Sequence, residues 1–383
     1  MAAKVQTDNN RTWAISLSAA VAALFVLYHW ILPASPASVQ SFVRGWFGVD
    51  SMNQMLIYVI MSLGLNIVVG YAGLLDLGFV AFWAIGGYCA GWFMSSFLNF
   101  TQFNLFGNAP VGQEYGIHIT FWWVLLIGGA ICAVAGIIIG APTLRLKSDY
   151  LALVTLGFGE IIPQVFLNGE NFFGLNISNG TKGITPIDHI KFFGLKTLGP
   201  FDSDLKMIIY AVIAAGGVFV SLRLRSGRLG RAWLAIREDE LAASMMGIPL
   251  MRTKLSAYAV GAFSGGLGGV AFATTVDGVY AERFNFSISI ILLAMVVLGG
   301  MGNVWGVILG SLVLAWINTT FLQQFGNTIN DALGVNINFP SFNFLIFGTI
   351  LILMMLFRRE GLLPEARTRL VMHEHDSDNQ GGH

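Results

Sequence analysis

Long apolar runs without charge dominate the chain. Residues 77–113 carry no charged side chain, and the same is true of 115–144, 255–276, 284–330 and 332–357. The hydrocarbon core of a bilayer is about 30 Å thick and needs roughly 20 apolar residues of helix to cross it. Runs of this length predict a polytopic helical membrane protein.

Ten segments of spanning length can be drawn along the chain. They lie near residues 14–32, 54–71, 77–98, 121–141, 150–168, 207–224, 255–275, 285–300, 303–322 and 341–357. We therefore expect an all-α fold of about ten transmembrane helices, with glycine admitted freely as lipid-embedded helices allow. The break at Gly299-Gly300-Met301-Gly302-Asn303 leaves open whether 285–322 forms two full spans or a re-entrant pair.

The distribution of basic residues orients these spans. If the N-terminus is cytoplasmic and ten spans alternate, 15 Lys and Arg residues lie inside and 6 lie outside. Cytoplasmic segments of membrane proteins carry an excess of basic residues. This pattern predicts that both termini are cytoplasmic.

The same layout gives the expected domain organisation. Residues 1–13 form a cytoplasmic N-terminus, 14–357 the transmembrane domain and 358–383 a cytoplasmic tail whose polar end we expect to be disordered. The segment 14–32 is longer than the apolar part of a typical signal peptide, which favours a retained helix. Two loops stand out, a long outer loop at 169–206 and a highly charged inner loop at 225–254.

Composition excludes several functional classes. Only 11% of the residues are charged, and 21 basic residues balance 21 acidic ones, so no basic field favours nucleic acid. Cys89 and Cys132 lie in apolar runs, where a buried free thiol is the expected state. His29, His118 and His189 are isolated, and His373 and His375 lack a third ligand nearby, so no metal site is expected.

Motifs of enzymatic chemistry are absent from the sequence. It contains no G-x-x-x-x-G-K-[ST] phosphate loop, no H-E-x-x-H and no G-x-S-x-G. We therefore expect a chain without catalytic residues, cofactor or ATPase site of its own.

The inner loop predicts a short helix on the cytoplasmic face. Residues 232–246 are good helix formers, and Gly247 followed by Pro249 supplies a stop. Arg237-Glu238-Asp239-Glu240 places charges of both signs around one turn. The pattern suits either a solvated surface helix or an element that docks into a soluble partner.

Two acidic residues lie in apolar surroundings. A carboxylate at the bilayer centre costs about 2.5–3.5 kcal/mol, so it should be paired, neutral or turned to a water-filled interior. Asp76, near the cytoplasmic edge, is interpreted as a cap of the helix that follows it. Glu160 is deeper and precedes Pro163, which is consistent either with the translocation path or with a pair that fixes helix packing.

Several stretches resemble one family of transporters. The inner loop, with Glu240-Leu241-Ala242-Ala243 through Gly247, is similar to the coupling loop of ATP-binding-cassette (ABC) importer permeases. Within those permeases, four further stretches resemble the LivM-type permeases of branched-chain amino acid importers: GYAGLLDLGFVAFWAIGGY from Gly70, LRLKSDYLALVTLGFGEI from Leu144, VVLGGMGNVWGVILGS from Val296 and FRREGLLPE from Phe357.

This resemblance implies a function and a set of partners. The chain would be a permease of the bacterial inner membrane that works by alternating access on leucine, isoleucine and valine. It would pair with a LivH-type permease, two ATPases of the LivG and LivF kind that hydrolyse the ATP, and an extracytoplasmic binding protein. The residues coupled to the ATPases would be Arg237, Glu238, Asp239, Glu240, Ala242, Ala243 and Gly247.

Two alternatives stay open at the level of sequence. Importers of urea and short-chain amides use very similar permeases, so the substrate could differ within the same architecture. A secondary transporter driven by an ion gradient through Asp76 and Glu160 is an alternative of another class.

Overall fold

The computed structural model describes residues 35–99, 102–107, 115–146, 148–192, 196–198, 202–334, 338–357 and 361–363. The predicted N-terminus 1–13, the predicted span 14–32 and nearly all of the predicted tail 358–383 lie outside these residues.

Apolar helices make up most of the described chain. They are α4 (Val49–Leu65), continued by the π-helical segment η2 (Asn66–Tyr71), then α5 (Val80–Phe93), α6 (Phe121–Thr143), α7 (Ser148–Leu167), α8 (Ser203–Ser226), α11 (Leu250–Val276), α12 (Phe286–Gly299), α13 (Val304–Trp316) and α15 (Asn343–Phe357). Seven helical stretches are long and apolar enough to cross a membrane, and α5 and the part of α15 up to Met354 are shorter apolar helices.

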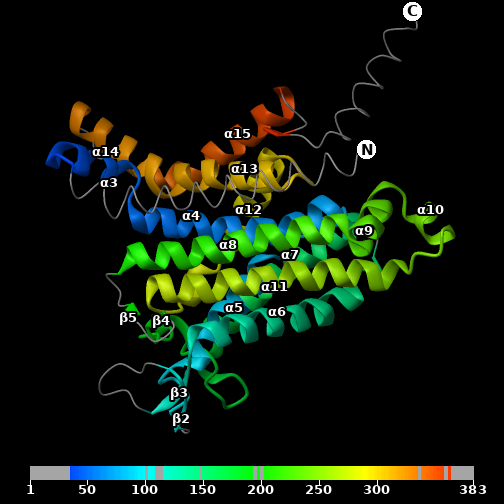
Figure 1. Ribbon diagram of the computed structural model, residues 1–383, viewed down its shortest axis with the longest axis horizontal. Coiled ribbons are helices and arrows are strands. Elements are labelled where there is room, and N and C mark those ends of the chain that lie inside the picture. Colours follow the sequence, from blue (N-terminus) through cyan, green and yellow to red (C-terminus); the bar gives the residue numbers. More distant parts are fainter. Residues whose placement is uncertain are drawn as a thin grey trace, which may run out of the picture.

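Helix α11 lies at the centre of the bundle, beside α4, α5, α6 and α8 (Figure 1). Its glycines allow neighbouring backbones to approach closely, as small residues do in lipid-embedded helices. A Cβ atom added at Gly269 would lie 2.3 Å from the carbonyl oxygen of Trp83 in α5, and one added at Gly266 would lie 2.8 Å from that of Gly128 in α6. The glycines of α11 therefore allow close packing on several neighbouring helices at once.

The two ends of the bundle differ in structure (Figure 1). One end carries α9 (Arg228–Glu238) and α10 (Glu240–Met245), and we call it the α9/α10 end. The other end, the strand end, carries a sheet of β1 (Met94–Ser95), β3 (Gly116–Ile119) and β2 (Gln102–Leu105), and a hairpin of β4 (Ile190–Phe192) and β5 (Lys196–Leu198). Short helical turns also occur there or nearby, at η3 (Gly169–Asn171), η4 (Gly180–Lys182) and η5 (Ala281–Arg283).

These strands qualify the expectation of an all-α chain. Strand β1 runs antiparallel to β3, whereas β2 runs parallel to it with Gln102 opposite Gly116. Each strand has two to four residues, too few to leave an alternating pattern in the sequence. They form because the loops that leave the bundle pair their backbones with one another.

The stretch 285–322 forms two separate helices. Helices α12 and α13 turn back on each other at Gly300–Asn303, and both Gly300 and Gly302 have positive φ. The second arm extends past the predicted end, through the π-helical segment η6 (Ile317–Phe321) and α14 (Leu322–Leu333), before η7 (Phe339–Phe342).

An additional helix, α3 (Ala37–Trp46), precedes α4, which itself begins five residues before the predicted span 54–71. Aromatic rings join α3 to the second arm of the hairpin: Trp46 lies 6.2 Å from Trp316 and 6.4 Å from Phe321, centroid to centroid. Residues 37–53 contain Asp50 and other polar residues, so their mean hydropathy is too low to predict a membrane span there.

Helix α5 begins three residues later than the predicted span 77–98. Residues 72–79 run without regular structure, and side chains from other helices bond N–H groups within this stretch and at the start of α5. The Leu77 N–H donates to Thr155 Oγ1 of α7 at 3.1 Å, and the Val80 N–H to Ser289 Oγ of α12 at 2.9 Å. Irregular backbone at membrane depth is tolerated where protein surrounds it and supplies such partners.

Candidate functional site

The predicted helix over residues 232–246 is divided in two. Asp239 has extended backbone, with φ −155°, and separates α9 from α10. Its carboxylate accepts hydrogen bonds from the N–H groups of Leu241 at 2.8 Å and Ala242 at 3.0 Å. Aspartate at this position stabilises a helix start, so the residue ends α9 and opens α10 in another direction.

Gly247 ends α10 in the left-handed conformation expected of a glycine stop. Its φ is +82°, and the Ile248 N–H donates back to the Ala243 carbonyl at 3.1 Å. A Cβ atom added at Gly247 would meet no atom within 4 Å. Glycine is therefore favoured by the backbone conformation and not by crowding.

Helix α9 is anchored on the start of α11. Trp233 is fully buried, and its indole N–H donates to the Thr253 carbonyl and to Ser256 Oγ, both at 3.0 Å. Glu240, the first residue of α10, accepts a 2.6 Å ion-pair contact from Lys254. These contacts fix the base of the segment to the bundle.

The far side of α10 is apolar and uncovered. Leu241, Met245 and Met246 are 68%, 78% and 84% exposed, whereas Ala243 is buried. Glu238, Asp239, Ala242 and Gly247 are exposed beside them. The segment thus presents flexible apolar side chains next to charges, a surface suited to a protein groove.

Arg237 points the other way. Its Nη1 donates to the backbone carbonyl of Gly70 in η2, across 167 residues of sequence. Of the seven residues predicted to couple to a partner, Arg237 and Glu240 thus contact the transmembrane bundle itself.

Asp76 lies inside the bundle and is 1% exposed. Its Oδ1 accepts from the Gly78 N–H at 2.9 Å, and the carboxylate also interacts with the Tyr258 side chain of α11. The residue that precedes α5 is Phe79, so Asp76 supports the turn before the helix and is not its N-cap. The predicted capping role is therefore displaced by one turn, because residues 72–79 do not begin the helix directly.

Glu160 lies on an exposed face of α7. Leu153, Gly157 and Gln164 share this face, at positions four, three and four residues apart. Gly159, its neighbour, packs against Gly78 instead, with an added Cβ only 3.0 Å from Gly78 Cα. The structure therefore does not bring Asp76 and Glu160 onto one surface, and α7 separates them.

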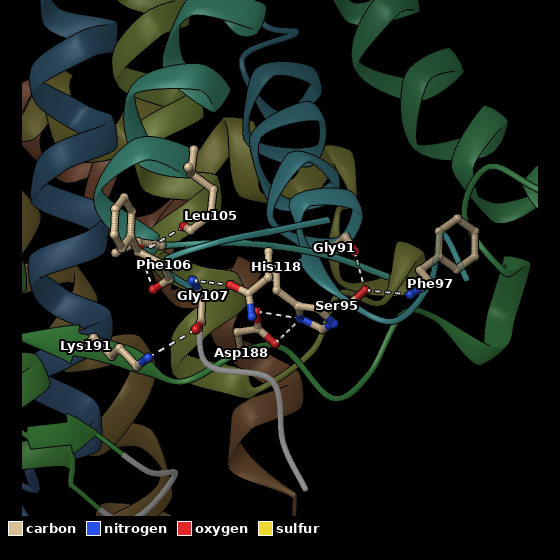
Figure 2. A network of polar contacts seen from close by, with 11 residues as sticks. Gly91, Ser95, Phe97, Leu105, Phe106, Gly107, His118, Asp188 and Lys191 are labelled. Carbon is tan, nitrogen blue, oxygen red and sulfur yellow. Dashed lines mark hydrogen bonds and ion pairs between the residues drawn. The ribbon is translucent and has the colours of Figure 1, made fainter. Parts of the chain in front are cut away.

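A polar pair at the strand end joins Asp188 to His118, a residue that appears isolated in the sequence (Figure 2). His118 Nδ1 of β3 lies 2.9 Å and 2.8 Å from the two carboxylate oxygens of Asp188, and both side chains are buried. Burial raises the pKa of Asp188 to about 6, although contact with His118 and Lys191 opposes this rise. The partners are 70 residues apart, so no local pattern could reveal them.

Lys191 strengthens the same connection. Its Nζ donates to the Gly107 carbonyl at 3.1 Å, just beyond β2 (Figure 2). The two contacts join the loop after α7 to the sheet between α5 and α6. The loops of the strand end are therefore held together by the buried His118–Asp188 pair and by the hydrogen bond of Lys191.

Comparison with known proteins identifies the family. The model of the family described as "Branched-chain amino acid transport system / permease component" matches residues 48–355. The high-affinity branched-chain amino acid transport system permease protein LivM of Salmonella typhimurium is 36% identical over 338 residues, 84% of this chain and 71% of that protein. The protein of the same name from Escherichia coli is also 36% identical, over 342 residues and the same shares of both chains.

A more distant relative extends the similarity to archaea. The probable branched-chain amino acid transport permease protein LivM of Methanocaldococcus jannaschii is 26% identical over 340 residues, 85% of this chain and 93% of that protein. No solved structure matches the chain. The long match to the family and the 36% identity over most of both chains lead to one conclusion: the chain belongs to the family of permease components of branched-chain amino acid transport systems.

Proposed function

We propose that the chain is the transmembrane permease subunit of an ABC importer that carries leucine, isoleucine and valine into the cell by alternating access. The proposal is supported by the structure of the α9–α10 segment. Trp233 and Glu240 anchor this segment to the bundle, whereas Leu241, Met245 and Met246 are exposed. An apolar tip is unfavourable in water unless a partner covers it. Since the sequence has no phosphate loop, the covering partner would supply the ATP hydrolysis.

The substrate assignment rests on the relatives. Both enterobacterial proteins are named as high-affinity branched-chain amino acid permeases and match most of this chain. The apolar helices and these relatives make it a multi-pass protein of the bacterial inner membrane.

The topology proposed for the chain has ten spans and two cytoplasmic termini. The described helices α4, α5, α6, α7, α8, α11, α12, α13 and α15 supply nine spans, and the segment 14–32 would supply the tenth. With α10 on the cytoplasmic side, the basic residues of the inner loop obey the excess of positive charge expected there. The strand end would then face outward.

A second permease of the LivH type would cover the exposed face of α7. A carboxylate facing lipid costs about 2.5–3.5 kcal/mol, which makes a lipid contact for Glu160 unfavourable. Gly157 on the same face has no atom within 4 Å of an added Cβ, leaving room for another helix. Glu160 would thus lie where two permeases meet, beside the substrate path.

The remaining partners are assigned to the two ends. Cassette ATPases of the LivG and LivF kind would receive α10. An extracytoplasmic binding protein would dock on the strand end, where His118, Asp188 and Lys191 hold the loops in place.

Two alternative functions can be distinguished by measuring transport. A urea or amide permease would share every feature described for α10, so only a comparison of substrates separates it. An ion-coupled transporter would need neither ATPase nor binding protein, and the separation of Asp76 from Glu160 by α7 gives no support to a common ion site.

The test uses the assembled complex in proteoliposomes. With ATPases, second permease, binding protein and ATP, we expect leucine uptake that greatly exceeds urea uptake, and no uptake by this chain alone under a sodium or proton gradient. Leu241→Glu with Met245→Glu should release the ATPases during purification, because a charge in an apolar groove must be desolvated.

Phe173→Glu provides the matched control. Phe173 is 92% exposed in the loop after α7, far along the chain from α10, and its replacement likewise puts a carboxylate in the place of an exposed apolar side chain. ATPases that stay bound to the double variant as firmly as to the control, or gradient-driven uptake by the isolated chain, would refute the proposed function. Preferred uptake of urea would refute only the substrate.

A further inference from the structure

Three segments from distant parts of the sequence meet near the α9/α10 end. They are η2, the turn Gly300–Asn303 and residues 361–363, which we call the three-segment junction. The Gly302 N–H donates to Asn66 Oδ1 of η2 at 2.9 Å, and Asn303 Nδ2 donates to the Leu363 carbonyl at 2.9 Å. The Leu362 N–H also donates to the Leu298 carbonyl at 2.8 Å.

The junction is tightly packed at its glycines. A Cβ atom added at Gly70 would lie 2.1 Å from Asn66 Oδ1 and 2.6 Å from the Gly302 nitrogen. One added at Gly361 would lie 2.6 Å from Gly300 Cα. Because backbone touches backbone at these positions, a displacement of η2 is passed directly to the turn and to residues 361–363.

Arg237 connects this junction to the docking segment. It lies in the last turn of α9, two residues before the break at Asp239, and donates to the Gly70 carbonyl. Its side-chain stem covers Gly73, where an added Cβ would lie 2.9 Å from Arg237 Cγ. By contrast, Trp233 bonds to α11 and Arg231 bonds to the nearby Ser226 carbonyl.

We infer that Arg237 is a positioning residue that transmits movement of α10 to the three-segment junction. This inference rests on the proposed function, since it presumes that an ATPase moves α10. A hydrogen bond from a guanidinium is among the stronger contacts available, and it ends on a π-helical segment, a kind of helix irregularity common at functional sites. Pulling on Gly70 would shift the ends of α4, α12 and α13 together.

The test compares uptake with hydrolysis in the complete complex. In Arg237→Met, the ATPases should copurify and hydrolyse ATP, but leucine transported per ATP should fall by about tenfold, the factor that loss of one charge-assisted hydrogen bond supplies. Arg237→Lys keeps one N–H donor and should recover part of the ratio. Gly73→Ala, which crowds the Arg237 stem, should lower the ratio as well.

Two variants serve as controls. Arg231→Met removes an arginine from the same helix, and Gly216→Ala adds a methyl group in α8 where no atom lies within 4 Å. Both should keep the parent ratio. If Arg237→Met transports as much leucine per ATP as the parent, the inference is wrong. It is also wrong if the ATPases dissociate from that variant alone, because Arg237 would then be a docking residue. If the parent binds no ATPase, the proposed function fails instead.

Discussion

His118 and Asp188 illustrate how burial changes the value of an ion pair. The pair is buried at the strand end, and His118 Nε2 has no hydrogen-bond partner among the described residues. In the loop after α7, which also carries Asp188, Lys182 and Glu170 form an ion pair at 3.1 Å, but their side chains are 71% and 60% exposed. Water can replace either partner of the second pair but not of the first.

We therefore predict unequal effects of removing one carboxylate. Asp188→Ala leaves both nitrogens of a buried ring unpaired and should lower the free energy of unfolding by about 1–3 kcal/mol. Glu170→Ala should lower it by no more than about 1 kcal/mol, since exposed pairs contribute little. Thermal unfolding in detergent measures both, and Asp188→Asn, which keeps an acceptor, should recover most of the loss. Equal destabilisation by the two alanine variants would contradict this account.

At the scale of elements, the inner loop shows what helix propensity does and does not determine. Residues 232–246 favour helix throughout, yet Asp239 takes extended backbone and bonds the N–H groups that follow it. The glycine stop at 247 was predictable because few other residues adopt a positive φ readily. The break was not, because an aspartate within a helix and an aspartate that starts one look alike in sequence.

Gly247 yields the prediction for this element. Gly247→Val should strain a left-handed backbone by roughly 1–2 kcal/mol and turn α10 away from its partner. We expect lost leucine uptake and weaker stimulation of the ATPases, with the chain still inserted in the membrane.

Gly348→Val is the corresponding control. Gly348 lies within α15, has ordinary helical backbone and meets no atom within 4 Å of an added Cβ. If Gly247→Val takes up leucine at the parent rate, the inner loop is a solvated connector without a role in coupling.

For the whole molecule, hydropathy located the described spans to within about five residues at each end, apart from the second arm of the α12–α13 hairpin, which extends further. It could not find the late start of α5, because residues 72–79 are as apolar as the helices around them. The sheet at the strand end and the three-segment junction were equally out of reach, since their hydrogen bonds join residues far apart in sequence.

Glu160 provides a prediction at this scale, because we propose that a second permease covers the exposed face of α7 on which it lies. We expect Glu160→Gln to preserve assembly with the second permease but to alter uptake, and Glu160→Ala to impair both. Copurification of the two permeases and uptake in proteoliposomes measure the two effects separately. An alanine variant that assembles and transports like the parent would mean that Glu160 lies neither on the path nor in the interface.

The glycine contacts of α11 divide the molecule into parts that can and cannot move. Where Gly269 meets the backbone of Trp83 and Gly266 that of Gly128, the backbones lie too close together to admit a side chain, which leaves little room for one helix to shift against the other. We therefore expect helices α5, α6 and α11 to move as one rigid block during a transport cycle. We expect movement instead in the α12–α13 hairpin, whose turn at Gly300–Asn303 lies in the three-segment junction. The protein would then consist of a rigid block of three helices and a movable helical hairpin. The turn of that hairpin would lie on the side of the membrane where ATP is hydrolysed.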